Sequence, residues 1–392
     1  MNIPTIREVS KQFFNGTHRA LTPEETCRIV RPLMPAIGIA EMLDLTPFDR
    51  LGIPVAATIR PRAARSVETL RAGAGTDPIF ARIAAIMAAI ERYSAEYRGQ
   101  HMHFASHEEL GLTRSVDPRD LILPRPVTMG EQVHWTPSWD LLNEEEIAVP
   151  SNAVYHPYDP MGMGQVLFQS DDIGLAGGME PEEAILHGML EVVERDALST
   201  AERARHLGTR ITVDRDGPAW RLLDIFAGAG IEMHLWLLSG RTGIPAVAAS
   251  ADDTVSKDPA LLVTGTAAHT DPEIAVIRAL LEVARSRAVY LHGGRVDAIR
   301  EAFARKAGYE RLKRINRLWY APGDETELSA ISSLSTERFD LDIARCLDEI
   351  GAHADRVCVA DLTSTAVPVV RVIIPGFEVS YTDTSRIRGH YV

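Results

Sequence analysis

A helix predicted over residues 180–205 constrains the fold of this chain more than any other segment. Four polar residues follow one another at steps of four, four and three, so they lie in one stripe of an α-helix. They are Glu183, His187, Glu191 and Glu194. The other flank is apolar, so the helix is expected to be largely buried, where carboxylates need compensating charge. The stripe predicts a site bridged by cations, and the alternative is a solvated face of ordinary Glu/Arg pairs.

The spacing of the carboxylates favours Mg²⁺ as the cation. Glu191 and Glu194 are three residues apart, which brings their Cβ atoms to about 5–6 Å of each other on a helix. Mg²⁺ prefers oxygen ligands and is usually shared with substrate phosphates. Arg195 follows directly and is placed to hold a phosphate oxygen.

Two other predicted helices carry related residues. The helix predicted over 78–97 contains Glu91-Arg92, which repeats the Glu194-Arg195 pair of the first helix. The helix predicted over 271–291 is basic, and its arginines are suited to balance carboxylates and bind phosphates. The alternatives are an ordinary helix-end pair in the first case and an intrahelical pair with surface arginines in the second. The residues of the basic helix are Arg278, Glu282, Arg285 and Arg287.

Helical and strand-like segments alternate along the chain, which predicts a mixed α/β fold. Further helices are expected to begin near residues 22–25 and to cover 341–351. Three strand-like runs, at 51–61, 242–250 and 365–376, each place a proline near the first residue of the strand. The similarity of these runs indicates either repeated strand–helix units or chance resemblance between strand starts.

The composition excludes several classes of protein. The chain has 392 residues, of which 45% are hydrophobic, enough for a large core. A formal net charge of −13 argues against nucleic acid and against an anionic membrane as partners. No apolar run is long enough to span a membrane, and the first residues do not resemble a signal peptide. Cys27, Cys346 and Cys358 form no metal or disulfide pattern, so we expect three reduced thiols and a cytoplasmic protein.

Read together, these segments resemble the YcaO family, in order and spacing, over nearly the whole chain. Several stretches look most like the methanogen branch of the family, among them Gly16-Thr-His-Arg19 and Ile374-Pro375-Gly376. The other stretches that carry the resemblance lie at 23–26, 49–61, 73–75, 90–96, 174–178, 182–184, 191–196, 278–282 and 286–287.

This resemblance implies the architecture and the ligands. It implies a YcaO-type fold of repeated strand–helix units around an internal ATP site, with residues 1–57 packing on a catalytic domain at 58–392. ATP and Mg²⁺ are the implied cofactors. The implied ligands of the metal are Glu91, Glu183, Glu191 and Glu194. The residues implied to contact the nucleotide are Glu91, Glu183, Glu194, Arg195 and Arg287.

The chemistry implied by the resemblance is ATP-dependent activation of a peptide backbone amide. In the family the amide oxygen attacks the γ-phosphate, a nucleophile adds to the carbon, and phosphate leaves; with sulfide the product is a thioamide. The methanogen branch is associated with thioamidation of a glycine in methyl-coenzyme M reductase, so its alpha subunit is the expected substrate. A TfuA-like sulfur-delivery protein and a second copy of the chain are further expected partners. Azoline-forming relatives end in a proline-rich tail, which residues 385–392 lack, so a thioamide product is favoured.

Four positions depart from the polar residues that the family has in its nucleotide site. They are Ala84, Ala88, Ile173 and Met179. The first hypothesis is therefore an active thioamide-forming enzyme with an altered site. The second is a catalytically impaired peptide-binding or scaffold protein. A carboxylate-bridged metallohydrolase is the third, and it explains the acidic stripe but not the other segments.

Overall fold

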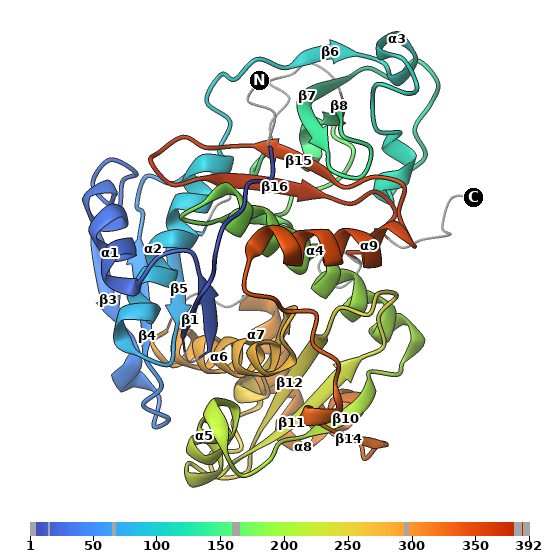
Figure 1. The fold of residues 1–392 in the computed structure, drawn as a ribbon. Helices are drawn as coiled ribbons and strands as arrows, with labels where there is room; N and C mark the ends of the chain where they lie inside the picture. The colour runs from blue at the N-terminus through green and yellow to red at the C-terminus, as the bar shows by residue number, and fades with distance from the viewer. Residues whose placement is uncertain are drawn as a thin grey trace.

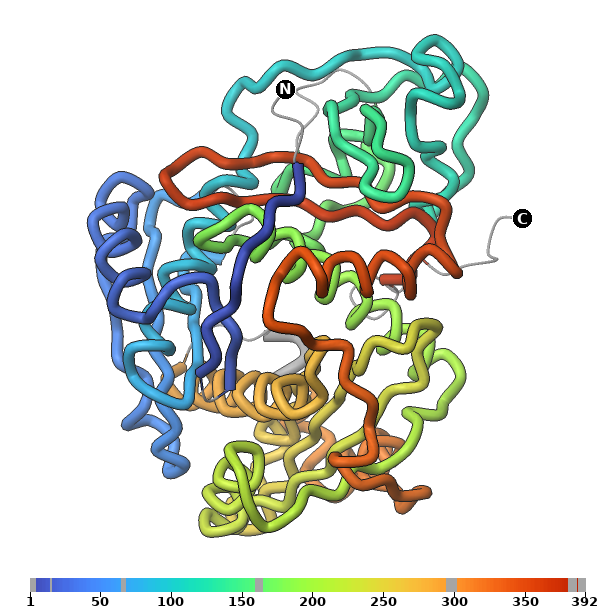
Figure 2. Tube along the Cα trace, viewed as in Figure 1, coloured from blue at the N-terminus to red at the C-terminus, as the bar shows by residue number. Residues whose placement is uncertain are grey.

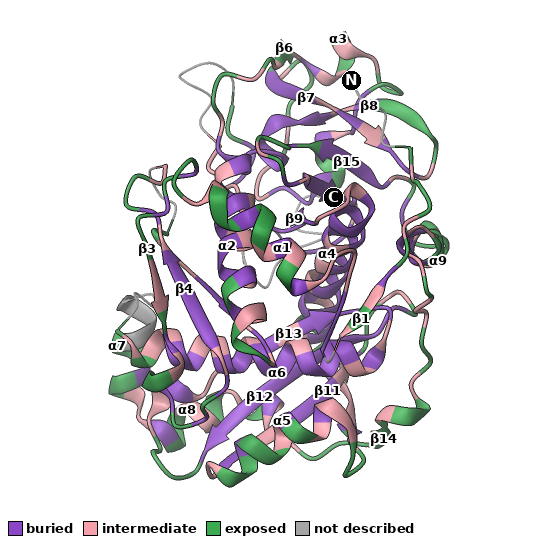
Figure 3. Ribbon diagram, turned by 60° about the vertical axis from the view of Figure 1, so that its left-hand side comes forward, coloured by how far each residue is buried: buried purple, intermediate pink, exposed green. Residues whose placement is uncertain are grey.

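The computed structural model describes residues 5–14, 16–64, 68–158, 165–293, 298–379 and 386. Three long helices lie at its centre, and sheets surround them (Figures 1 and 2). Shorter helices cover the outside, where Figure 3 shows more exposed residues than on the central elements. The helices are α1 (Pro23–Val30), α2 (Pro78–Ala95), α3 (His107–Leu110), α4 (Pro181–Ala204), α5 (Gly217–Gly228), α6 (Pro272–Leu291), α7 (Ala298–Ala307), α8 (Tyr309–Ile315) and α9 (Phe339–Gly351).

The described strands form four sheets, and all pairs are antiparallel except β10 with β14. The three-stranded sheet has the order β3 (Glu41–Asp44), β4 (Val55–Ile59), β5 (Leu70–Ala74). The five-stranded sheet has the order β13 (Thr264–Ala268), β12 (Ala246–Asp253), β11 (Ile231–Leu238), β10 (Gly208–Thr212), β14 (Glu325–Glu327). The six-stranded sheet has the order β6 (His103–Ala105), β7 (Val133–Asp140), β15 (Cys358–Asp361), β16 (Val369–Ile373), β9 (Leu175–Gly177), with β8 (Glu145–Pro150) on β7. A small hairpin consists of β1 (Gln12–Phe14) and β2 (Thr17–Arg19).

The central helices belong to three strand–helix units of the same construction. Strand β5 leads into α2, β9 into α4 and β13 into α6, and each helix has a proline in its first turn. The strands that pair with β5, β9 and β13 are β4, β16 and β12. Those three strands are the runs whose similarity was noted in the sequence. The expectation of repeated strand–helix units is therefore confirmed.

Each central helix packs between two sheets, because its own sheet and a neighbouring sheet both present apolar faces to it. Helix α4 packs on β9 and β16 of its own sheet and on β12 and β13 of the five-stranded sheet. The alternation of side chains along β12 explains the second contact. Ala246 and Ala248 belong to the core that contains α4, whereas Val247, Ala249 and Ala251 belong to the core that contains α6. Both faces of β12 are thus buried, and its first four residues are all apolar.

The other two central helices also pack between two sheets, so the three helices and their sheets form a ring. Helix α6 packs on β12 and β13 and also reaches β4 and β5, while α2 packs on β4 and β5 and also reaches β9 and β16. The packing requires small residues between β5 and α2: a Cβ atom added at Gly73 would lie 2.4 Å from the backbone nitrogen of Ala85. The three helices therefore surround one central space.

The division of the chain into residues 1–57 and 58–392 stays a prediction. In the structure the expected boundary falls inside β4, the middle strand of the three-stranded sheet. Of the tail at 385–392, only Arg386 lies within the described residues.

The cysteines are free, with Cys346 and Cys358 buried. Among the described helices, none has the length and apolar character needed to cross a bilayer.

Candidate functional site

The three central helices enclose a cavity of about 450 Å³. Each of the three helices has a proline in its first turn. On each helix, the residues that lie six, ten and thirteen positions after this proline line the cavity. These steps of four and three residues place the side chains in one stripe per helix. The six-residue positions are Ala84, His187 and Arg278, the ten-residue positions Ala88, Glu191 and Glu282, and the thirteen-residue positions Glu91, Glu194 and Arg285.

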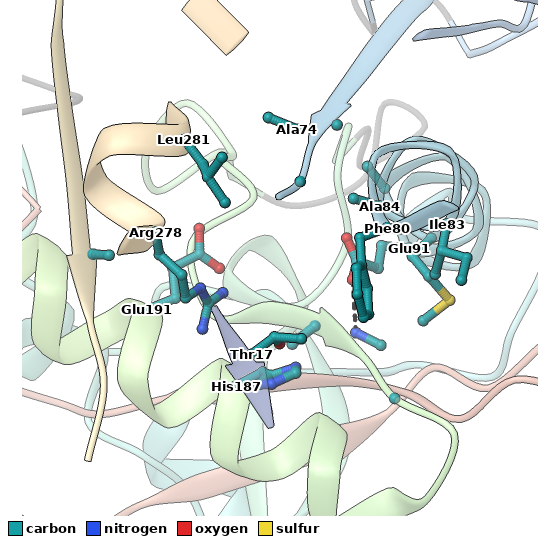
Figure 4. A pocket seen from close by; sticks show the side chains of 18 of the residues that line it. Thr17, Ala74, Phe80, Ile83, Ala84, Glu91, His187, Glu191, Arg278 and Leu281 are labelled. Atoms are coloured by element: carbon teal, nitrogen blue, oxygen red, sulfur yellow. Dashed lines mark hydrogen bonds between the residues drawn. The ribbon is translucent and has the colours of Figure 1, made fainter. Parts of the chain in front are cut away.

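Glu91 and Glu191 lie on different helices and line this cavity together (Figure 4). Glu91 Oε1 accepts a hydrogen bond from the Gly177 N–H at 2.9 Å, and Glu191 Oε2 accepts one from the Gly174 N–H at 3.1 Å. Burial raises the pKa of each carboxyl to about 7. A cation in the cavity would favour the ionised form of both groups.

The other two predicted carboxylates are also brought to the cavity, and each already has partners. Glu183 accepts the Met179 N–H at 2.8 Å and lies 3.6 Å from Arg19, while burial raises its pKa. Glu194 Oε1 accepts the Thr266 hydroxyl at 2.5 Å. All four predicted acidic residues therefore share one lining, from two helices of different units.

Arginines line the same cavity, and one of them is the predicted Arg195. Its Nη1 lies 3.3 Å from Glu194 Oε1 and donates to Thr266 Oγ1 at 3.5 Å. Burial lowers the pKa of Arg278 and that of Arg92, the latter to about 9. The further arginines in the lining are Arg19, Arg71, Arg92, Arg278 and Arg285. Of these, Arg278 occupies the helical position of His187, a correspondence visible in the sequence once the first-turn prolines are aligned.

Arg287 lies elsewhere, and its expected contact with the nucleotide is not supported by its position. It is fully buried and donates to Asp49 at 2.8 and 3.2 Å and to Asp253 at 3.1 Å. It is not among the residues that line the cavity. Arg287 is two positions after Arg285, about 200° around a helix, which turns its side chain away from the stripe that faces the cavity.

The carboxylates of the cavity do not form a closed metal cage. Among the described residues, only Glu232, His234 and Asp252 bring three such ligand atoms within 4.8 Å of one another. A cation between the cavity carboxylates would need further oxygen ligands from a bound molecule. This is the usual situation of Mg²⁺ in nucleotide sites, where phosphates complete the coordination.

The group of Glu232, His234 and Asp252 is poorly suited to bind a metal. Arg210 Nη2 lies 3.0 Å from His234 Nδ1. A guanidinium group donates hydrogen bonds but does not accept them, so Nδ1 accepts and the ring proton is on Nε2. Asp252 accepts from the Tyr309 hydroxyl and from Lys313. These contacts describe a hydrogen-bonded cluster on β11 and β12 rather than a metal site.

Four apolar residues stand where the family has polar ones in its nucleotide site, and three of the four line the cavity. Ala84 and Ala88 lie on the face of α2, and Met179 lies just before α4. Ile173 is buried in the core beside α4 instead. The wall formed by α2 is therefore apolar up to Glu91, with Phe80, Ile83 and Met87 as its larger members.

The residues present fit a magnesium–nucleotide ligand. The acidic groups supply only oxygen donors, as Mg²⁺ requires, and one oxygen of Glu91 and of Glu191 is already oriented by a backbone N–H. Guanidinium groups on α2, α4 and α6 are placed to contact phosphate oxygens. The cavity volume falls within the range of about 300–1,000 Å³ that small-molecule sites occupy.

Comparison with known proteins assigns this chain to a family. The model of the YcaO family, described as a cyclodehydratase that binds ATP and Mg²⁺, matches residues 72–378. An uncharacterized protein of Methanothermobacter thermautotrophicus is 44% identical over 378 residues, which cover 94% of this chain and 97% of the relative. An uncharacterized protein from the tfuA 3′ region of Rhizobium leguminosarum bv. trifolii is 28% identical over 397 residues, covering 95% of this chain and 90% of the relative.

A solved structure is similar over the same extent. YcaO from Methanopyrus kandleri, bound with AMPPCP and Mg²⁺, matches with a TM-score of 0.81 and 30% identity, covering 97% of each chain. The fold expected from the sequence is thus confirmed, with ATP and Mg²⁺ as the ligands of the family. By the extent of the family match and by its architecture, this chain belongs to the YcaO family.

Proposed function

We propose that this chain is an ATP- and Mg²⁺-dependent enzyme that activates a peptide backbone amide and forms a thioamide. The observation that carries the proposal is the convergence of carboxylates and guanidinium groups from three helices on one cavity. Phosphoryl transfer is catalysed mainly by positioning and by charge stabilisation, and both need such an array.

The roles of the residues follow from their contacts. Glu91, Glu183, Glu191 and Glu194 are assigned to Mg²⁺, which supplies positive charge against the phosphates. Arg195 is assigned to phosphate oxygens, together with Arg278, which faces Glu191 in Figure 4. Arg287 is assigned a structural role, because it is fully buried away from the cavity and pairs with Asp49 and Asp253.

The proposed substrate is a glycine of the alpha subunit of methyl-coenzyme M reductase. Relatives from two methanogens, Methanothermobacter and Methanopyrus, support this choice of substrate. A TfuA-like protein is proposed as the partner that delivers sulfur, and the position of the Rhizobium relative beside tfuA supports it. A cytoplasmic location and a homodimer are part of the same proposal.

The test uses the purified full chain with ATP, Mg²⁺, sulfide and a peptide that contains the candidate glycine. We expect ADP and phosphate release that depends on the peptide, and a peptide mass that corresponds to replacement of oxygen by sulfur. Glu191→Gln should abolish both signals. ATP turnover without any sulfur in the peptide would overturn the thioamide assignment and leave amide activation in place.

The apolar wall of the cavity favours a second candidate, a catalytically impaired YcaO-like protein that binds peptides or acts as a scaffold. Ala84, Ala88 and Met179 offer no ligand to a cation or a phosphate. Titration calorimetry separates the two candidates. Absence of binding for ATP with Mg²⁺, combined with retained peptide binding, would support the scaffold and contradict the enzyme.

A further inference from the structure

The N-terminal segment contributes to the cavity although it lies outside the part of the chain that the family model matches. That match begins at residue 72. Gly16, Thr17 and Arg19 nevertheless line the cavity from the β1–β2 hairpin. The function proposed above assigns no role to this Gly-Thr-His-Arg stretch.

The hairpin is held in place by a strap, which we define as residues 5–14 and 16–19. At one point Arg7 binds Glu182 at the start of α4, with contacts of 2.8, 3.0 and 2.9 Å to a carboxylate that is 1% exposed. At another point Lys11 pairs with the buried Asp342 of α9. A ring contact between Phe14 and Phe80, 5.7 Å between centroids, joins the strap to α2. These contacts bring Arg19 to α4.

Arg19 is oriented by His187 and Glu183. Its Nη1 donates to His187 Nε2 at 2.8 Å and lies 3.6 Å from Glu183 Oε1. Burial, with the charges of Arg19 and Arg278, lowers the pKa of His187 well below its usual value, so the ring is neutral. The ring also bonds the Gly177 backbone, which fixes the tautomer with the proton on Nδ1 and the lone pair on Nε2. Figure 4 places His187 beside Thr17 of the hairpin.

Two positively charged side chains, Arg19 and Arg278, influence each other at this point of the cavity. The pKa of Arg278 is lowered by burial and, next, by the charge of Arg19. Two guanidinium groups that repel each other beside one cavity form a favourable arrangement when an anion binds between them. The strap therefore adds positive charge at a place where the helices already carry one cation.

We propose that Arg19 binds phosphate oxygens of the nucleotide and that His187 is the positioning residue that holds it. The proposal rests on the function proposed above for the cavity. It assigns the strap a direct part in ligand binding and explains why a neutral histidine stands in an otherwise charged stripe. An arginine at position 187 would repel Arg19, and a glutamate there would add a second carboxylate beside Glu183 and neutralise Arg19 further.

The test measures binding of AMPPCP with Mg²⁺, and separately of inorganic triphosphate without metal, by titration calorimetry. Arg19→Ala should weaken both by about tenfold or more, as expected for loss of a charge-assisted hydrogen bond. His187→Leu should weaken both to a similar extent. His187→Gln should restore binding, because its amide oxygen can accept from Arg19. Arg28→Ala, an exposed arginine of α1, is the control for a general loss of positive charge and should bind as the wild type does.

The double variant Arg19→Ala/His187→Leu separates positioning from a purely structural role. We expect it to bind no more weakly than Arg19→Ala alone, because His187 acts through Arg19. Additive losses, or an Arg19→Ala protein that binds both ligands like the wild type, would overturn the proposal. If the wild type binds triphosphate through Arg19 but does not bind AMPPCP, the anion site stands and the nucleotide function falls.

Discussion

Glu91 on α2 and Glu191 on α4 act on each other across the cavity: the charge of Glu91 contributes to the raised pKa of Glu191, after the larger effects of burial and of the charge of Glu194. Each carboxyl has a pKa of about 7 in the folded protein, against an ordinary value of 4.5. A ligand-free cavity is therefore partly protonated near neutral pH. A cation that binds between the two groups must displace those protons.

Mg²⁺–nucleotide binding should consequently release protons and strengthen as the pH rises through 7. Calorimetry at pH 6.5 in buffers of different ionisation enthalpy measures the number released, which should fall toward zero at pH 8.5. A binding constant independent of pH between 6 and 8 would contradict the role of these two groups.

The same groups set a trend in stability without ligand. Between pH 4.5 and 7 the folded state binds more protons at Glu91 and Glu191 than the unfolded state does, so their contribution to the free energy of unfolding should fall as the pH rises. Denaturant unfolding of the wild type and of the Glu91→Gln/Glu191→Gln variant at pH 5 and pH 7.5 measures it. The variant should lose less stability than the wild type over this interval.

Glu191→Gln should weaken Mg²⁺-dependent nucleotide binding by about 10-fold to 100-fold, as removal of a metal-site group commonly does. It should leave the thermal midpoint at pH 8 unchanged or raised, because it removes a buried charge. Glu24→Gln, on an exposed position of α1, is the matched control and should change neither property. Equal binding in Glu191→Gln and wild type would exclude Glu191 from the site.

Ala84→Ser combined with Ala88→Glu should increase nucleotide affinity, since both positions line the cavity on the face of α2 that carries Glu91. The added carboxylate lies one turn before Glu91 and supplies a further oxygen ligand for Mg²⁺. Calorimetry in Mg²⁺ measures the change, and Ala85→Ser, on the buried side of the helix, is the control for α2 itself. An unchanged affinity would contradict the position assigned to the metal.

Arg287→Met should destabilise the fold by about 3–5 kcal/mol, because it leaves the buried Asp49 without its arginine and removes one of the two arginines that pair with the buried Asp253. Nucleotide affinity of the folded fraction should stay within about twofold, since Arg287 does not line the cavity, whereas removal of a charge-assisted hydrogen bond would cost far more. Chemical denaturation and calorimetry on the same preparation measure both quantities. A selective loss of affinity at normal stability would return Arg287 to the nucleotide site.

Gly73→Ala should be strongly destabilising, because the added Cβ would lie 2.4 Å from the Ala85 nitrogen and 2.5 Å from Ala84 Cβ. Strand β5 and helix α2 would have to separate at the cavity wall. Gly228→Ala at the end of α5 is the matched control, since its new Cβ would meet no atom of another part of the fold within 4 Å; alanine there should leave the stability unchanged or slightly raised. Thermal unfolding of both variants measures the contrast.

The helices and the acidic stripe could be predicted from local patterns. The helix expected at 180–205 is observed as Pro181–Ala204, and the one expected at 78–97 as Pro78–Ala95. Apolar periodicity and first-turn prolines are signals within a single helix, so they need no tertiary information. The same signals placed Glu183, Glu191 and Glu194 on one face before any contact was known.

The position of Arg287, away from the cavity, could not be read from local patterns. Spacing alone does not say which face of an arginine-rich helix meets a cavity and which meets a neighbouring strand. In α6 the side chain of Arg287 is held by Asp49 and Asp253, which are 238 and 34 residues away along the chain. Arg19 was missed as a site residue for a similar reason, since its partner His187 is 168 residues away.

The sequence by itself determined the local elements, the polar stripe on each helix and the resemblance that assigns the family, because these depend on residues close together in the chain. Only the tertiary structure decided that three such stripes face one cavity, that an N-terminal arginine joins them, and that burial brings two carboxyls to a pKa of about 7. The physical reason is that burial and charge coupling depend on distances in space, which the packing of α2, α4 and α6 between the sheets sets.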